Sequence, residues 1–285
     1  MSDHKVNMDD DTHHDEGAPL HRQLTTVTLT AKQFESLYLQ PRDPRMEERY
    51  TRQFGNPTPF GLTCFILAHI PLTMDFLNFQ GATAASSTTM LGVFYGVAGI
   101  GLYLSCIMEW VMGNTFPSCV FGTFGGFWIS YGLLLQPTMD IAASFAPASD
   151  GVNGAAATMA GAATRAYNSG VAMYFVVWSI LGFIYFLAAL RTNVPFAMVF
   201  LTFVCALDFI AAGYFHSGVG KFELATKEFK AGGAFAFCTG MFALYIDINL
   251  ILGSVGFRWS NPLFDISHFN FFKARDKNSE KEHEA

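Results

Sequence analysis

Apolar residues are concentrated in the middle of the chain, in long runs that short polar or glycine-rich segments separate. A helix needs roughly 20 apolar residues to cross a bilayer, and six runs have about that length. Frequent glycine and alanine, without strict alternation, argue against the strands of a membrane barrel. The pattern therefore predicts an all-α membrane protein, a bundle of six transmembrane helices. The expected spans are residues 59–79, 90–112, 118–136, 169–190, 195–215 and 231–253.

Polar segments flank the apolar region on both sides. Residues 1–53 are polar and rich in acidic, serine and threonine residues, which predicts a tail without a stable fold, and residues 256–285 predict a second polar tail. Residues 54–255 then form the membrane domain. Its longest link is 137–168, and the link 216–230 is amphipathic enough for a short helix at the membrane surface.

Basic residues near the spans predict the orientation. An even number of spans puts both termini on one side of the membrane, and loops that face the cytoplasm carry an excess of Lys and Arg. Eight such residues fall on the side of the termini and four on the other, which predicts cytoplasmic termini. The eight are Arg42, Arg45, Arg49, Arg52, Arg191, Arg258, Lys273 and Arg275, and the four are Arg165, Lys221, Lys227 and Lys230.

Composition removes several classes of function. Hydrophobic residues make up 51% of the chain and charged residues 14%, and the net charge of −6 gives no sign of a nucleic-acid surface. The five cysteines lie in apolar runs without ligand spacing, so neither a metal site nor a disulfide framework is expected. We also find no catalytic triad or phosphate-binding loop, and we expect no enzyme activity and no cofactor.

The first span opens with the segment FGNPTPFGLTCF, residues 54–65. One interpretation is structural: Pro57 and Pro59 belong to the first turn of a helix that Asn56 caps. The other is functional, because prolines lack N–H donors and Gly61 lets backbone come near. The exposed amides of such a segment can face a small polar or anionic guest at a positive helix start.

Ionisable residues inside spans are functional candidates by default. We consider four carboxylates as candidates for a proton or polar relay: Asp75, Glu109, Asp208 and Asp247. For Glu109 the competing hypothesis is structural, namely that it accepts hydrogen bonds from the adjacent GNTF turn. For Asp208 and Asp247 the competing hypothesis is hydrogen bonding between helices.

Several motifs resemble one known family. NPTPFGL (56–62) resembles the NPxPxGL signature of the acetate uptake transporter family, which includes the bacterial YaaH and is widespread in fungi. Further blocks follow in the family's order over residues 54–255, and five blocks in register across six spans are specific. They are GVFYG (92–96), MEWVMGNTFPS (108–118) with GTFGGFW (122–128), LRTN (190–193) and KAGGAF (230–235).

The resemblance implies a function and a partner set. It implies a plasma-membrane transporter of acetate or another short carboxylate, generally coupled to protons, that assembles in the bilayer as a hexameric ring with a path inside each protomer. It also implies an apolar constriction of three large side chains, which by position are Phe65, Phe124 and either Phe203 or Leu201. The other residues expected along the substrate pathway are Asn56, Pro57, Pro59, Gly61, Asn114 and Thr115.

Some residues depart from the family's pattern. His69, Pro71 and Asp75 interrupt a first span that is more apolar in the family, and residues 244–252 depart from its usual sixth span. These departures leave open another solute, or export instead of import, and one alternative is a transporter of another small solute, such as an ammonium exporter. A second alternative, of another class, is a membrane sensor that no longer transports. The departures also suggest the hypothesis that Asp75 lies in the pathway and repels anions.

Overall fold

The computed structural model describes residues 54–147, 151, 153–257 and 262–266. Six helices in this part are long and apolar enough to cross a membrane, which confirms the all-α membrane fold. Within the described residues, β-structure is limited to an isolated antiparallel bridge between Asn193 and Asp265. The predicted tail 1–53 and most of the predicted tail 256–285 lie outside the described residues.

Each expected span corresponds to one helical segment. The second span is π-helical in its first half, η3, and α-helical in its second, α4, with helical dihedral angles at their junction. The spans are α3 (Thr58–Phe76), η3 (Val93–Ile100) with α4 (Gly101–Val111), α5 (Thr115–Leu135), α7 (Arg165–Ala189), α8 (Val194–Ser217) and α9 (Phe222–Ser254).

Polar residues explain where two of the helices begin. The Asn193 side chain accepts a hydrogen bond from Phe196 N at 2.9 Å, and Pro195 follows in the first turn of α8. The Thr164 hydroxyl accepts a hydrogen bond from Tyr167 N at 3.4 Å at the start of α7. Because such caps satisfy backbone donors that the helix leaves free, α7 begins four residues before the expected apolar run.

The sixth span differs most from the prediction. The expected surface helix over 216–230 is not separate: α8 continues to Ser217, and α9 is one helix of 33 residues, about 50 Å long. Gly232 and Gly233 do not end it, because both are buried against neighbouring helices. A Cβ atom on Gly232 would lie 2.8 Å from Ile210 Cγ1, and one on Gly233 would lie 2.7 Å from Phe76 Cβ. These glycines allow close helix packing.

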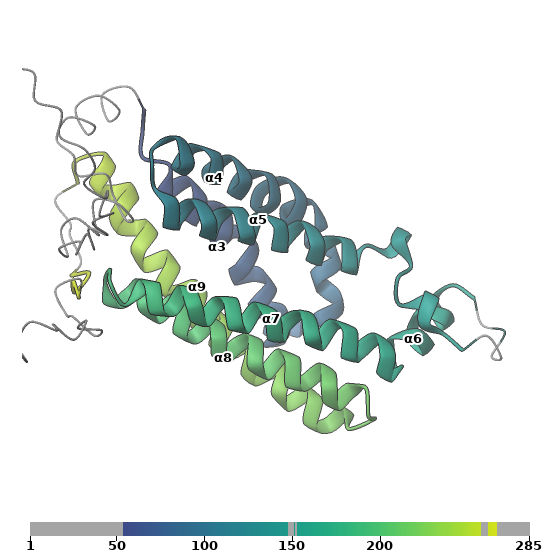
Figure 1. The fold of residues 1–285 in the computed structure, drawn as a ribbon. Helices are drawn as coiled ribbons and strands as arrows, with labels where there is room; N and C mark the ends of the chain where they lie inside the picture. Colours follow the sequence, from purple (N-terminus) through teal and green to yellow (C-terminus); the bar gives the residue numbers. More distant parts are fainter. Residues whose placement is uncertain (1–53, 148–150, 152, 258–261, 267–285) are drawn as a thin grey trace, which may run out of the picture.

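The helices form two groups (Figure 1). Helix α4 lies beside α5 in one group, α7 lies beside α8 in the other, and α9 packs against both α8 and α3. The core between the groups is largely aromatic, with Phe94, Trp128 and Phe200 among its most deeply buried side chains. The link 137–168 contains a short helix, α6 (Ala155–Ala162).

The bundle has two distinct ends. We call tail end the one with residues 54–57, the turns 112–114 and 190–193, and residues 262–266. We call loop end the one with residues 77–92, 136–147, 153–164 and 218–221. The segment 262–266 folds back onto the tail end: Val194 N donates to Phe264 O, and Ile266 N donates to Thr192 O, both at 3.1 Å. This part of the predicted C-terminal tail is therefore attached to the membrane domain.

Close packing at Gly232 can be tested with two substitutions in the same helix. We expect Gly232→Ala to lower the unfolding free energy by about 1–3 kcal/mol, because the new methyl would also lie 3.0 Å from Ala206 O of α8. Gly253→Ala is the control, since nothing lies within 4 Å of its added Cβ. Thermal unfolding in detergent measures both, and equal stability of the two variants would contradict the packing argument.

Candidate functional site

A cavity of about 380 Å³ opens at the tail end of the bundle, and we call it the vestibule. Its polar lining includes side chains from residues at helix starts and turns: Asn56, Thr58, Thr192, Asn193 and Asp265. The rest of the lining is apolar and comes from α3, α4, α5, α8 and α9, together with Leu263. On α3, Thr58, Leu62 and Phe65 are spaced three or four residues apart, so one helical face leads from the polar mouth toward the core.

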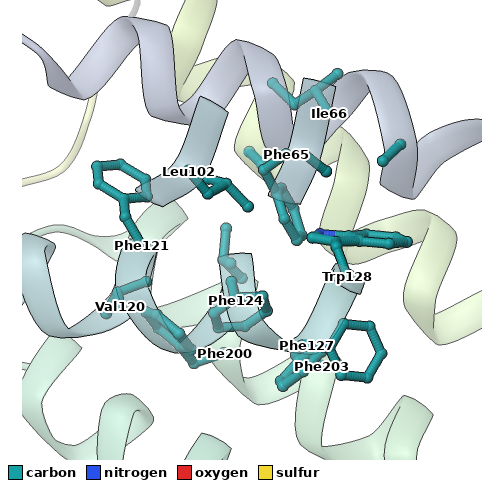
Figure 2. Close-up of a cluster of buried hydrophobic side chains, with 14 of the residues drawn as sticks. Phe65, Ile66, Leu102, Val120, Phe121, Phe124, Phe127, Trp128, Phe200 and Phe203 are labelled. Carbon is teal, nitrogen blue, oxygen red and sulfur yellow. The ribbon is translucent and has the colours of Figure 1, made fainter. Parts of the chain in front are cut away.

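Three phenylalanine rings meet at the inner end of the vestibule (Figure 2). The ring centroids of Phe65 and Phe124 are 5.5 Å apart with an interplanar angle of 86°, and those of Phe124 and Phe203 are 5.1 Å apart at 46°. All three side chains are buried, whereas Leu201 is 38% exposed on the outer side of α8. The structure thus brings together Phe65, Phe124 and Phe203, which we call the three-ring contact, and leaves Leu201 out of it.

A second, smaller cavity of about 40 Å³ lies on the other side of these rings, and we call it the inner cavity. Phe65 and Phe124 line both cavities, so the three-ring contact separates them. The inner cavity is lined mostly by aromatic and aliphatic side chains, and its polar groups belong to His69, Thr73, Trp128 and Tyr131. A water molecule needs roughly 10–15 Å³ of such space, so the inner cavity has room for a small solute.

The opening of α3 combines the two interpretations of its sequence. The N-cap position of α3 is Pro57, one residue after the expected Asn56, and Pro59 lies in the first turn. Asn56 Oδ1 accepts a hydrogen bond from Thr58 N at 3.0 Å. Gly61 is a packing position, because a Cβ atom there would lie 2.6 Å from the Phe121 ring. Asn56 and Thr58 nevertheless line the vestibule, whereas Pro57, Pro59 and Gly61 do not.

Glu109 is fully buried at the tail end and connects three helices. Its carboxylate accepts hydrogen bonds from Thr58 Oγ1 of α3 and from Asn114 Nδ2 at the start of α5, both at 2.5 Å. Asn114 N also donates to Glu109 O at 2.9 Å. Asn114 is buried in this network and Thr115 is exposed, and neither lines the two cavities.

The other three acids have separate hydroxyl partners. Asp75 accepts a hydrogen bond from Ser87 Oγ at 3.2 Å, Asp247 from Thr63 Oγ1 at 2.8 Å, and Asp208 from Ser179 Oγ at 2.6 Å. Asp75 and Asp247 are buried, but Asp208 is exposed on the outer surface of the bundle. None of these three side chains lines either cavity, so the structure does not bring the four acids together.

Residues 38–258 match the GPR1/FUN34/yaaH family. The chain belongs to this family. Protein alcS of Aspergillus fumigatus is 33% identical over 251 residues, covering 88% of this chain and 89% of alcS. The acetate transporter protein patA of Penicillium expansum is 30% identical over 224 residues, covering 76% of this chain and 80% of patA. Ammonia transport outward protein 3 of Saccharomyces cerevisiae is 26% identical over 204 residues, covering 70% of this chain and 65% of that protein.

One solved structure shares the fold of this protein. The structure of the bacterial acetate channel SatP matches with a TM-score of 0.56 and 18% sequence identity, covering 74% of this chain and 99% of that chain. At this identity the likeness shows the common arrangement of helices. It agrees with the six membrane-spanning helices derived from the sequence.

Two groups of lining residues were not predicted from the sequence. The first is Thr58 and His69, which helical spacing would have placed on the same face of α3 as Phe65. The second is Leu263 and Asp265, which line the vestibule although they follow the last span. No local pattern indicates that second contact, because it depends on how the chain folds back onto residues 192–194.

The hydrogen bonds of Glu109 predict that a substitution of nearly the same size destabilises the protein. In Glu109→Gln one acceptor oxygen is replaced by an NH2 group, which would then face the donor of Thr58 or Asn114. We expect the unfolding free energy to fall by about 1–3 kcal/mol. Glu223→Gln, at an exposed position in the first turn of α9, is the control. If thermal unfolding of Glu109→Gln matched wild type, the network would not be a joint between helices.

Proposed function

We propose that the protein carries acetate or a related short-chain carboxylate across the plasma membrane. The path would run inside one protomer, from the vestibule through the three-ring contact to the inner cavity. The names of patA and SatP support this choice of substrate. The observation that carries the proposal is the three-ring contact itself, which closes the apolar end of a cavity that is open and polar at its mouth.

The charges along the path favour passage of the neutral acid. Among the described residues that line the two cavities, Asp265 at the mouth is the only one with a formal charge. A carboxylate that enters an apolar passage loses its hydration at a high cost, and the neutral acid loses far less. A short-chain acid has a pKa near that of Glu, about 4.3, so its protonation at pH 7 costs roughly 3.7 kcal/mol. We therefore propose proton-coupled passage.

Purified protein in liposomes tests the proposal directly. We expect labelled acetate to enter these liposomes faster than protein-free ones, and faster still when an inward proton gradient is imposed. Ammonium release measured in the same vesicles tests the alternative that the protein exports ammonium. Acetate uptake by protein that lacks residues 1–50 tests the alternative that the protein is a sensor, because a transporter keeps its flux without this tail. Vesicles as tight to acetate as empty ones, at every pH from 5 to 8, would overturn the proposal.

Widening the three-ring contact should increase flux. We expect Phe124→Ala and Phe203→Ala to raise acetate flux by about tenfold, which corresponds to ~1.4 kcal/mol less at the barrier. Leu201→Ala, on the outer side of the same helix as Phe203, should leave flux unchanged. The measurement is initial uptake per folded protein in liposomes. Equal flux in Phe203→Ala and Leu201→Ala would remove Phe203 from the constriction.

We also propose that the tail end faces the cytoplasm and that six copies assemble in a ring. The excess of basic residues on the side of the termini supports the orientation. The exposed carboxylate of Asp208 supports association, since a charged side chain within a span is costly against lipid and a neighbouring copy would cover it. Light scattering of the detergent-purified protein measures the number of copies.

A further inference from the structure

Trp128 carries a buried hydrogen-bond donor without a partner. Its side chain is 0% exposed, and its Nε1–H finds no acceptor among the described residues. The indole stacks on Phe94 with centroids 5.0 Å apart, and Figure 2 shows its nitrogen on the edge turned toward Phe65. A buried donor that stays unpaired costs roughly 1–3 kcal/mol, so this N–H calls for a ligand that accepts hydrogen bonds.

His69 lines the same inner cavity and has a second ring nitrogen, Nδ1. Its Nε2 lies 2.8 Å from Ala236 O, and because a carbonyl only accepts, Nε2 carries a hydrogen atom. The adjacent Cδ2 faces Gly240, where a Cβ atom would lie 3.3 Å away. The Nε2–Cδ2 edge is thus directed at α9, and Nδ1 lies on the opposite side of the ring. In the part of the chain that the structure describes, no hydrogen-bond partner is found for Nδ1.

Both rings line the inner cavity, directly behind the three-ring contact. Their centroids are 6.3 Å apart and their planes are nearly perpendicular, at 81°. His69 also stacks on Phe65 with a centroid separation of 4.5 Å, so it is fixed against one of the three rings. The remaining lining is mainly aromatic and aliphatic, apart from the hydroxyl groups of Tyr131 and of Thr73, which donates to Ile70 O. His69 and Trp128 are the two nitrogen-bearing rings of this lining.

We propose that His69 and Trp128 bind the carboxyl group of a short acid in the inner cavity. Trp128 Nε1–H donates to one carboxyl oxygen, and His69 Nδ1 shares one proton with the other oxygen. That proton lies either on the acid, which then donates to a neutral imidazole, or on the imidazole, which then donates to a carboxylate. No covalent bond to carbon changes in either case. The proposal takes the substrate class from the proposed function.

The size of the cavity limits the acids that this site accepts. A volume of about 40 Å³ has room for the two carbons and two oxygens of acetate. Its methyl group would lie against the phenylalanine rings. An aromatic acid such as benzoate is too large to enter without displacing Phe65 or Phe124.

Binding can be measured on the wild-type protein without any transport assay. The chain has four tryptophans, so protein labelled with ¹⁵N-tryptophan gives few indole N–H signals. The indole N–H signal of Trp128 is assigned as the one that disappears in the spectrum of Trp128→Phe. We expect sodium acetate to shift this signal saturably, while sodium benzoate and sodium chloride at equal ionic strength leave it in place. A Trp128 signal that does not move with acetate, or moves equally with chloride, would overturn the site.

Flux in liposomes gives the second measurement. We expect Trp128→Phe and His69→Gln to raise the acetate concentration for half-maximal flux by about tenfold, the effect of losing one hydrogen bond to a charged or shared-proton group. Trp178→Phe is the matched control, because its indole packs on Phe124 and Phe127 but lines neither cavity.

The two measurements separate the site from the function. If wild-type protein passes no acetate but its Trp128 signal shifts with acetate, the proposed function fails and the binding site stands. If wild type passes acetate while Trp128→Phe behaves like Trp178→Phe and the signal stays fixed, the site fails and the function stands.

Discussion

The bilayer gives buried polar groups no water to bind, and this constraint shapes the whole bundle. Each of the four candidate acids, Asp75, Glu109, Asp208 and Asp247, accepts a hydrogen bond from a hydroxyl group on another element. The Thr58–Glu109 and Thr63–Asp247 bonds connect α3 to α4 and α9, and Ser179–Asp208 connects α7 to α8. The acids that sequence alone makes candidates for a relay thus also hold helices together.

The same pairing leaves the proposed path almost free of fixed charge. Because the acids point into contacts between elements, the described lining of the two cavities is set by phenylalanines and by polar groups at the mouth. A passage of this kind discriminates between solutes by their free energy of dehydration, which is much smaller for a small neutral acid than for its anion. Charge selectivity then depends on the proton that the acid carries.

Trp128 and His69 are exceptions to the rule that polar groups are satisfied within the protein. Most other polar side chains of the described core meet a partner from a neighbouring turn or helix. The indole N–H lacks one, as do Ser105 Oγ and one oxygen each of Asn114 and Asp247, and the hydrogen bond of the His69 ring is made through Nε2. An unpaired donor is tolerated when it is compensated in another state of the molecule. In the bound state the proposed carboxyl group accepts the hydrogen bond of the Trp128 indole. In the empty site this donor stays unpaired and destabilises the protein.

The sequence by itself determined the six spans, because hydrophobic length is a local property that the bilayer thickness fixes. It also indicated Phe65 and Phe124, since each lies at a fixed distance from a recognisable motif. Only the tertiary structure showed that Phe203 is buried against Phe124 while Leu201 is exposed, because which face of α8 is buried depends on its packing against α7 and α9. It alone paired Thr63 with Asp247, which are 184 residues apart, and placed Asp265 at the mouth of the vestibule. Such contacts arise from helix packing, and no local pattern in the chain encodes the partner.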